Sequence, residues 1–498
     1  MASQRSFLNA IKWSYTATWG ERAFSAVFTV VLAALLGPRD FGIVSIALVY
    51  IVFLQMFLDQ GLVAALIQKK NLEHEHVDAV FWMVLGLSFV LSGLSILLSR
   101  WWAAVNHAPQ VAAIISVLSL CIPIEALAIV QKTILSREMD FKTLAIRSNA
   151  SVVFSGLIGI GMAYAGFGVW ALVGQQISRD LSSLALLWKL SSWRPRLQFS
   201  VAHLKELMGF SVSNFVAQLG IFADTQTSSI LLGLFFGPLA VGLYRLADRI
   251  VNNILAAATC SIQWVSLPEF SRFQDQPVEL RKSVITCIHL SSTVTLPALT
   301  GLAAVSGPLM ATLGPKWIPA AGVLKILCIL GMLLTLAFFT GPLLQALSKV
   351  RLVAILEWVR TGIGMAMLVT AGLLVRHGAV NEQILAIALA RLVTAALLVT
   401  PVFVYLLMRM AGISFRDLLS SIAPSASASM GVAGAVTLVQ YIGGFVTDRP
   451  PILLAGDVVV GGATGLAILF LLDVQLRTKV TGLVRKTLGA ETLAKTPA

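Results

Sequence analysis

The sequence has little charge. Asp, Glu, Lys and Arg make up only 12% of its 498 residues, whereas 57% are hydrophobic, and the mean hydropathy is +0.87. Soluble domains carry about 25% charged residues. The scarcity of charge therefore excludes a soluble protein and indicates a polytopic membrane protein.

Long polar loops are also lacking. The longest turn on the side that we predict to face outward runs only from about Arg100 to Pro109. This leaves no room for an extramembrane catalytic domain, which a membrane polymerase or glycosyltransferase typically needs to carry its catalytic acids or histidines. We therefore expect a protein that is not an enzyme.

Cysteine is scarce, and the cysteines do not have the spacing of a metal site. The cysteines lie within or at the edges of apolar runs, where free Cys behaves as a small hydrophobe. His74 and His76 flank Glu75 on a loop, but an exposed pair without further ligands usually holds no metal. We expect no metal and no other cofactor, and structural thiols at Cys121, Cys260, Cys287 and Cys328.

Fourteen apolar runs are long enough to cross a membrane, which takes roughly 20 residues. The first is predicted to be an uncleaved helix, because no convincing small-residue cleavage site accompanies it. The spans are expected at residues 12–35, 41–66, 79–98, 110–131, 149–165, 168–188, 207–235, 239–266, 284–305, 319–345, 352–374, 383–407, 420–441 and 452–472.

Most of the 36 Lys and Arg residues fall on one side of these spans. Such an excess marks the cytoplasmic side of a membrane protein, and it places both termini in the cytoplasm. The net charge of +13 is therefore a signal of orientation. Because no contiguous basic domain is present, a nucleic acid is not expected as a partner. The predicted outer turns hold only Arg39, Arg100, Lys316, Arg376 and Arg449.

One turn sequence occurs twice. Residues 37–42 read Gly-Pro-Arg-Asp-Phe-Gly, residues 237–242 read Gly-Pro-Leu-Ala-Val-Gly, and each copy lies between long apolar runs. Gly and Pro are ordinary turn residues, but their repetition at equivalent places indicates two related halves. Because six spans, an even number, separate the copies, the halves have the same orientation and a symmetry axis along the membrane normal.

Paired lobes of this kind occur in transporters whose site opens alternately to two sides. The sequence therefore predicts an all-α membrane protein of about 14 transmembrane helices, with two parallel six-helix lobes and two C-terminal helices. The lobes are expected at 1–190 (helices 1–6) and 206–410 (helices 7–12), followed by helices 13 and 14 at 418–475 and a cytoplasmic tail at 476–498.

Several short motifs resemble those of one family. Residues 237–249, which read Gly-Pro-x-x-x-Gly-x-Tyr-x-x-Ala-x-Arg, resemble the second-lobe hairpin of Wzx-type polysaccharide repeat-unit flippases. The loop after the predicted fourth span, the entry into the sixth and three shorter segments are also similar to theirs. These segments are residues 136–145, 166–173, 267–272, 314–317 and 344–347.

The resemblance implies the fold of the multidrug/oligosaccharidyl-lipid/polysaccharide exporter superfamily. It implies movement of an undecaprenyl-pyrophosphate-linked oligosaccharide across the bacterial inner membrane, for exopolysaccharide, capsule or O-antigen synthesis. The expected partners are the lipid-linked oligosaccharide and membrane lipids, with a polysaccharide polymerase and chain-length machinery as further candidates. The family often has an Asp five residues before the glycine that Gly233 matches; this chain has Ser228 there, and Asp224 lies one turn earlier.

Ionisable residues within the predicted spans indicate the site. Each costs about 2.5–3.5 kcal/mol in a bilayer, so it must pair internally or face a wet cavity. Arg245 and Arg249 lie one turn apart on the eighth span, where two guanidinium groups suit a pyrophosphate. Polar residues also recur at helical spacing on spans one, two and seven, so these four helices are expected to line a cavity. The substrate-binding candidates are Arg22, Asn214, Gln218, Arg245, Arg249 and Asn252, and the candidates for ion coupling or a charge network are Glu21, Asp59, Asp224 and Asp248.

Alternatives remain at two levels. Some of the charged residues can form ion pairs that touch no ligand. The coupling ion can be H⁺ or Na⁺, because a carboxylate alone does not identify it. A drug or metabolite exporter of the same superfamily is the alternative function, and its cavity is expected to be more aromatic and less cationic. The structural pairs to consider are Arg179 with Asp180, Glu357 with Arg360, and Arg245 with Asp248.

Overall fold

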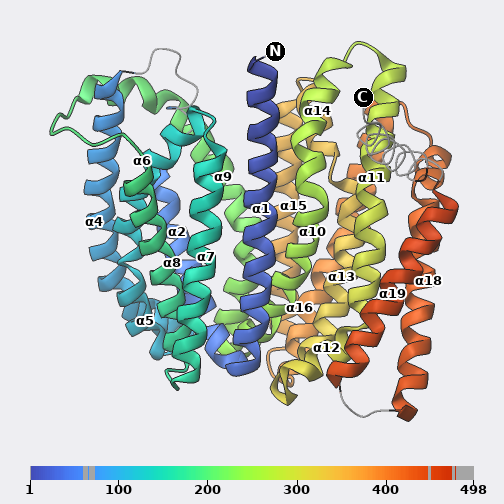
Figure 1. Ribbon diagram of the computed structural model, residues 1–498. Helices are drawn as coiled ribbons and strands as arrows, with labels where there is room; N and C mark the ends of the chain where they lie inside the picture. Colours follow the sequence, from blue (N-terminus) through green and yellow to red (C-terminus); the bar gives the residue numbers. More distant parts are fainter. Residues whose placement is uncertain (1, 60–65, 67–72, 447–449, 474–476, 478–498) are drawn as a thin grey trace, which may run out of the picture. The chain divides into compact units, whose positions relative to one another are not determined.

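The computed structural model describes residues 2–59, 66, 73–446, 450–473 and 477 (Figure 1). All regular structure in these residues is helical, which confirms the predicted all-α membrane protein. A helix satisfies its backbone N–H and C=O groups internally, so an apolar chain can cross lipid in this form. The predicted tail, residues 476–498, lies outside the described residues except for Arg477.

The first half of the chain forms long helices joined by short turns. The repeated turn closes two helical hairpins, one of α1 and α2 and one of α9 and α10. The helices are α1 (Ala2–Leu35), α2 (Pro38–Asp59), α4 (His74–Val105), α5 (Gln110–Leu118), α6 (Cys121–Arg137), α7 (Phe141–Tyr164), α8 (Val169–Leu190), α9 (Val201–Phe236) and α10 (Pro238–Arg272).

The second half continues in the same way, with more interruptions. A 3₁₀ turn, η1, lies between α12 and α13, and a π-helical segment, η2, lies between α16 and α17. The elements are α11 (Pro277–Ala304), α12 (Ser306–Leu313), η1 (Pro315–Trp317), α13 (Ala320–Ala337), α14 (Thr340–Ala346), α15 (Val350–Leu374), α16 (Val380–Thr394), η2 (Ala395–Val399), α17 (Thr400–Ala411), α18 (Phe415–Val446) and α19 (Pro450–Leu472).

Eleven helical segments of the described residues are long and apolar enough to cross a membrane. Three further helices, α1, α8 and α10, coincide with predicted spans but carry ionisable side chains such as Glu21, Arg179 and Arg245. These side chains lower the hydropathy of helices that are otherwise long enough to cross. The chain is therefore a multi-pass membrane protein, and the count of fourteen spans remains a prediction.

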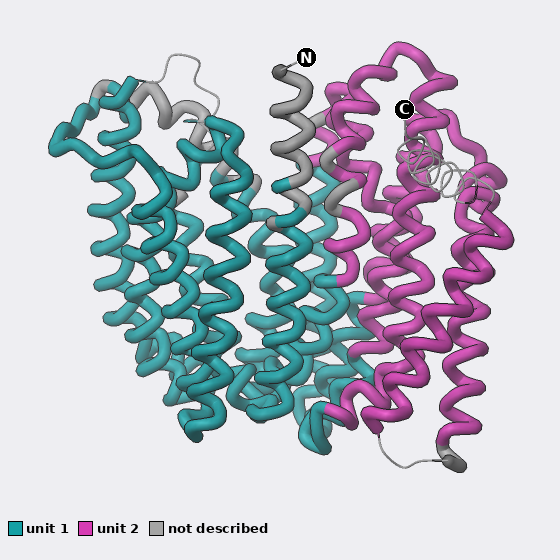
Figure 2. Tube along the Cα trace, viewed as in Figure 1, with its two compact units in different colours: residues 1–253, 313–323, 354–391 teal, residues 254–312, 324–353, 392–498 magenta. Residues whose placement is uncertain are grey.

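The chain divides into two compact units (Figure 2). The first comprises residues 1–253, 313–323 and 354–391, and the second comprises residues 254–312, 324–353 and 392–498. In the first unit α7 packs between α1 and α8, and α2 packs against α5, α8 and α9. In the second unit α18 packs against α11 and α19. The lobes expected from the repeat, 1–190 and 206–410, are a different division and remain a prediction.

The two copies of the repeated turn meet inside the first unit. A Cβ atom on Gly42 would lie 1.7 Å from the carbonyl oxygen of Pro238, and one on Gly242 would lie 1.7 Å from that of Pro38. Each hairpin can approach the other this closely only because glycine has no side chain. The contact is reciprocal, since the same position of each copy touches the same position of the other, and this is the pattern of a two-fold relation.

Trp317 packs against the first hairpin, which α1 and α2 form. The turn at Gly314 has φ +116°, a conformation that favours glycine, and it is followed at once by η1. Trp317 is 1% exposed, its Nε1 donates a hydrogen bond to the carbonyl oxygen of Ala33 at 2.7 Å, and its ring meets that of Phe41 edge-on at 5.5 Å. The tryptophan thus contacts both helices of the hairpin.

Candidate functional site

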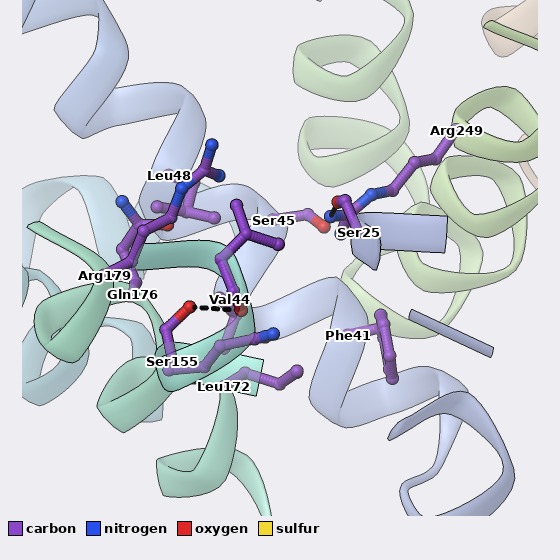
Figure 3. A pocket seen from close by; sticks show the side chains of 12 residues that line it. Ser25, Phe41, Val44, Ser45, Leu48, Ser155, Leu172, Gln176, Arg179 and Arg249 are labelled. Carbon is purple, nitrogen blue, oxygen red and sulfur yellow. Dashed lines mark hydrogen bonds between the residues drawn. The ribbon is translucent and has the colours of Figure 1, made fainter. Parts of the chain in front are cut away.

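A small polar cavity lies among α1, α2, α7, α8 and α10 in the first unit (Figure 3). Its volume is about 90 Å³. Ser25 reaches it from α1, Gln176 and Arg179 from α8, and Arg249 from α10. Polar side chains within membrane helices are expensive unless they face water or one another, so their convergence marks a candidate site.

Arg249 directs its guanidinium group toward α1. Its Nη2 donates a hydrogen bond to Ser25 Oγ at 2.9 Å, and the residue is exposed. No ion pair joins Arg249 to a carboxylate within the described part of the chain. Because an arginine stays charged at any physiological pH, this cavity carries a positive charge that an anion can bind.

Arg245 lines a second, adjoining cavity. This cavity has a volume of about 180 Å³ and shares Leu48 and Gln176 with the first. Gln226 also lines it, and the Oε1 atom of this side chain is buried with no hydrogen-bond partner among the described residues. A buried polar atom in that state is rare in proteins, so the second cavity offers an unused acceptor beside its arginine.

Asp248 lies between two arginines. Its Oδ2 is 3.9 Å from Arg245 Nη1, and its Oδ1 is 3.6 Å from Arg391 Nη1. Arg391 also donates a hydrogen bond to the hydroxyl of Tyr244 at 3.0 Å. The Arg245–Asp248 pair proposed as a structural alternative therefore exists, but one carboxylate divided between two guanidinium groups leaves an excess of positive charge.

Glu21 pairs with Arg179 and so joins α1 to α8. Asp180, the neighbour of Arg179, instead accepts a hydrogen bond from Gln176 Nε2 at 3.1 Å. The two neighbours thus have different partners, and the alternative pair of Arg179 with Asp180 is replaced by one between helices. Arg22 is half-buried and belongs to neither of the two cavities.

Asp224 belongs to a separate charge network. Arg360 on α15 binds it through Nη2 at 2.9 Å from Oδ2, and the same nitrogen lies 2.7 Å from Glu357 Oε2. The predicted Glu357–Arg360 pair is therefore confirmed, with Asp224 as a third member. Asp224 does not line either cavity.

The remaining candidates do not converge on the cavities. Gln218 and Asn252 are exposed and line neither cavity. The side chains of Asp59 and Asn214 lie outside the described part of the structure. Of the ten candidates, Arg249 lines the first cavity, Arg245 lines the second, and Asp248 pairs with Arg245, all on α10.

Two cavity residues, Gln176 and Arg179, are absent from the candidates selected from sequence. The sequence does contain a signal for them, because the polar pairs 175–176 and 179–180 lie one helical turn apart in an otherwise apolar span. From sequence, Arg179 is interpreted as a partner of Asp180 and not as a substrate-binding candidate. Its side chain lines the same cavity as Arg249 (Figure 3), and this depends on how α8 is rotated against α1, which periodicity alone does not fix.

Comparison with known proteins is consistent with this architecture. The model of a family described as polysaccharide biosynthesis protein matches residues 31–322, which is more than half of the chain. The chain is 26% identical to the succinoglycan biosynthesis transport protein ExoT of Rhizobium meliloti (strain 1021), over 68% of this chain and 69% of ExoT. It is 25% identical to the lipopolysaccharide biosynthesis protein WzxC of Escherichia coli (strain K12), over 70% of this chain and 72% of WzxC.

A solved structure shows the same fold. The structure of the lipid II flippase MurJ in an inward closed conformation superposes with a TM-score of 0.71 and covers 93% of this chain and 98% of MurJ. The sequence identity is only 14%, so this likeness bears on the fold alone.

Proposed function

The chain belongs to the family of polysaccharide biosynthesis proteins, and on this premise we propose that it is a lipid-linked oligosaccharide flippase. Its substrate is an undecaprenyl-pyrophosphate-linked repeat unit, which crosses the bacterial inner membrane for exopolysaccharide, capsule or O-antigen synthesis. The proposal agrees with the name of ExoT, a transport protein of succinoglycan biosynthesis. The chain moves its substrate and does not convert it.

The observation that carries the proposal is the exposed Arg249 in a polar cavity, hydrogen-bonded only to the neutral Ser25 among its described partners. Arg245, one turn away on α10, lines the adjoining cavity. A pyrophosphate presents several anionic oxygens, and a guanidinium group binds such oxygens through a planar fork of donors. These two arginines bind the pyrophosphate, and Arg22 assists from α1.

The size of the cavities supports alternating access. Volumes of about 90 and 180 Å³ hold only a few water molecules, since each water occupies about 30 Å³ of liquid. An oligosaccharide with its pyrophosphate is far larger than either cavity, so we expect the helices around the cavities to move apart when the substrate enters. Movement of the two predicted lobes would separate these helices. The excess of Lys and Arg on one side of the spans supports a cytoplasmic location of both termini.

Asp248 is the carboxylate best placed to couple transport to an ion. It lies between Arg245 and Arg391, so substrate phosphates compete with it for the same guanidinium groups. Asp224 pairs with Arg360, which lines neither cavity. Glu21 pairs with the cavity residue Arg179 and is a second candidate. Asp59 remains a fourth candidate, and the coupling ion is H⁺ or Na⁺.

The alternative of a drug or metabolite exporter has less support. Phe41 is the one aromatic side chain among the described residues that line the two cavities, whereas aromatic surfaces typically bind drug-like ligands. The lining instead contains three arginines, Arg179, Arg245 and Arg249. Lipid-linked oligosaccharide and membrane lipids are the proposed partners, and a polysaccharide polymerase and chain-length machinery are expected to use its product.

Complementation tests the proposal. In a strain that lacks the gene, Arg245→Ala and Arg249→Ala are each expected to reduce polysaccharide export at least tenfold and to leave lipid-linked intermediate on the cytoplasmic side. Arg409→Ala is the matched control, because Arg409 is an exposed arginine that lines neither cavity. If both cavity variants export normally at normal protein levels, the pyrophosphate site is not where we place it.

A further inference from the structure

Three side chains that commonly bind transition metals lie together where α4 and α9 begin. Glu73 directly precedes α4, His76 belongs to its first turn, and His203 belongs to the first turn of α9. One potential ligand atom from each of the three lies within 4.8 Å of the other two. His203 is distant from the other two in sequence, so the His74–His76 pattern gave no indication of this cluster.

The spacing of Glu73 and His203 fits a shared metal ion. Glu73 Oε2 is 3.4 Å from His203 Nε2. Two ligand atoms on one tetrahedral zinc ion lie roughly 3.3 Å apart, given Zn–N and Zn–O distances of about 2.0–2.2 Å. Glu73 is the exposed member of the cluster, so its carboxylate can adjust to an ion with little cost in packing.

His203 has a hydrogen-bond partner on the ring nitrogen that faces away from the cluster, as metal-binding histidines usually do. Its other ring nitrogen, Nδ1, lies 2.6 Å from Ser200 Oγ. Hydrogen bonds of this kind fix the orientation of a metal-bound imidazole and leave Nε2 as the ligand atom. Ser200 directly precedes α9, so the same short segment supplies both the ligand and its support.

His76 is the buried member, with 3% of its surface exposed. Its ring lies edge-on to that of His203 at a centroid distance of 4.3 Å, and its Nδ1 accepts the backbone N–H of Glu73 at the long distance of 3.4 Å. A bond of this length is weak. The imidazole of His76 must be neutral to bind a metal ion through a ring nitrogen.

The segment that leads to His203, residues 191–200, is held against α4 by hydrogen bonds and an aromatic contact. The backbone N–H of Arg196 donates to Asp78 Oδ1 at 3.2 Å, and Trp82 Nε1 donates to the carbonyl oxygen of Arg196 at 2.7 Å. The rings of Trp193 and Phe81 pack against each other with their centroids 5.5 Å apart. Residues 191–200, which connect α8 to α9, thus follow the first turns of α4 until they reach His203.

We propose that Glu73, His76 and His203 bind a divalent transition metal ion of the Zn²⁺ type, which fastens the start of α9 to the start of α4. Two imidazoles and one carboxylate are a ligand set that zinc and its neighbours prefer over Mg²⁺ or Ca²⁺. The bound ion restrains the connection between the two repeated halves of the chain. This site stands on its own geometry and does not depend on the proposed transport function.

Metal binding to the purified protein tests the proposal. Full-length protein in detergent micelles, freed of any purification tag that contains His, is titrated with ZnCl₂ by calorimetry in a chelator-free buffer. Wild type is expected to bind one Zn²⁺, and His203→Ala and Glu73→Gln are each expected to lower the affinity at least tenfold. His74→Ala is the matched control, because His74 is the exposed histidine beside the cluster and lies outside it.

Thermal unfolding supplies a second readout. Zn²⁺ is expected to raise the melting temperature of wild type and of His74→Ala, to have no effect on His203→Ala, and to lose its effect when EDTA is added. Unaltered Zn²⁺ binding in His203→Ala and Glu73→Gln, or an equal loss in His74→Ala, would overturn the site. Neither measurement depends on transport, so a failure of the metal-site proposal can be distinguished from a failure of the flippase proposal.

Discussion

Gly42 on α2 and Gly242 on α10 hold equivalent positions in the two hairpins, and each is packed against the backbone of the other hairpin. A methyl group at either position would overlap a proline carbonyl oxygen at 1.7 Å. The clashing atom belongs to the backbone and not to the end of a flexible side chain, so a change of rotamer cannot remove the clash. The contact between the hairpins therefore depends on these two residues being glycine.

Gly42→Ala is expected to destabilise the protein by about 1–3 kcal/mol, as overpacking typically does. Gly242→Ala should have a similar effect. The double variant should cost less than the sum of the two, because both substitutions force apart the same pair of hairpins. The melting temperature of the purified protein measures each effect.

The control for the glycine variants is Gly93→Ala on α4, where an added Cβ meets no atom within 4 Å. Alanine is preferred over glycine inside a helix by roughly 0.5–1 kcal/mol, so this variant is expected to melt at or slightly above the wild-type temperature. Equal melting temperatures for Gly42→Ala and Gly93→Ala would contradict the close contact.

Trp317→Phe removes the indole N–H that binds the carbonyl oxygen of Ala33 and keeps an aromatic ring against Phe41. We expect a loss of about 1 kcal/mol, the usual net value of one hydrogen bond. Trp101→Phe serves as the control, since Trp101 is 58% exposed. The two substitutions should therefore differ clearly in thermal unfolding, and a shift of the same size for both would argue against a specific role of Trp317.

Arg360→Met leaves the carboxylates of Asp224 and Glu357 without their shared partner. Because all three side chains are partly exposed, we expect a loss of about 1–3 kcal/mol rather than the larger cost of a fully buried pair. Adding Asp224→Asn and Glu357→Gln to Arg360→Met should recover part of the melting temperature. If the neutral triple variant is no more stable than Arg360→Met, the network is not held by charge.

Arg249→Lys separates charge from geometry at the proposed site. Lysine keeps the positive charge but lacks the planar fork of arginine. We expect polysaccharide export between that of wild type and that of Arg249→Ala, measured at matched protein levels. Export equal to that of Arg249→Ala would mean that the fork is essential, and full activity would mean that charge alone is sufficient.

The positions of the helices were predictable from sequence because apolar runs and Gly-Pro turns are local signals. Where one predicted span became two helices, a proline lies at or near the break. Pro123, Pro342 and Pro401 lie at or just after the α5–α6 junction, the α13–α14 junction and η2. Proline has no N–H to donate to the preceding turn, which weakens the regular helix there, although α10, α11 and α18 continue through Pro268, Pro297 and Pro424.

The partners of the charged residues were less predictable. Glu357 and Arg360 lie three residues apart on one helix, and their pair could be recognised from spacing. Glu21 and Arg179 lie on different helices, and their pair depends on the rotation of α1 and α8 about their axes. The same holds for His76 and His203, which meet only because residues 191–200 follow the start of α4.

The reciprocal glycine contact also constrains how the two halves of the chain can diverge. If both hairpins descend from one ancestral hairpin, positions 42 and 242 were once a single position. The contact between the hairpins still requires glycine at both of them. Positions 45 and 245 descend from a single position too, yet one is serine and the other arginine. Duplication thus released the residues that face the cavities while it held fixed the residues on which the hairpins meet.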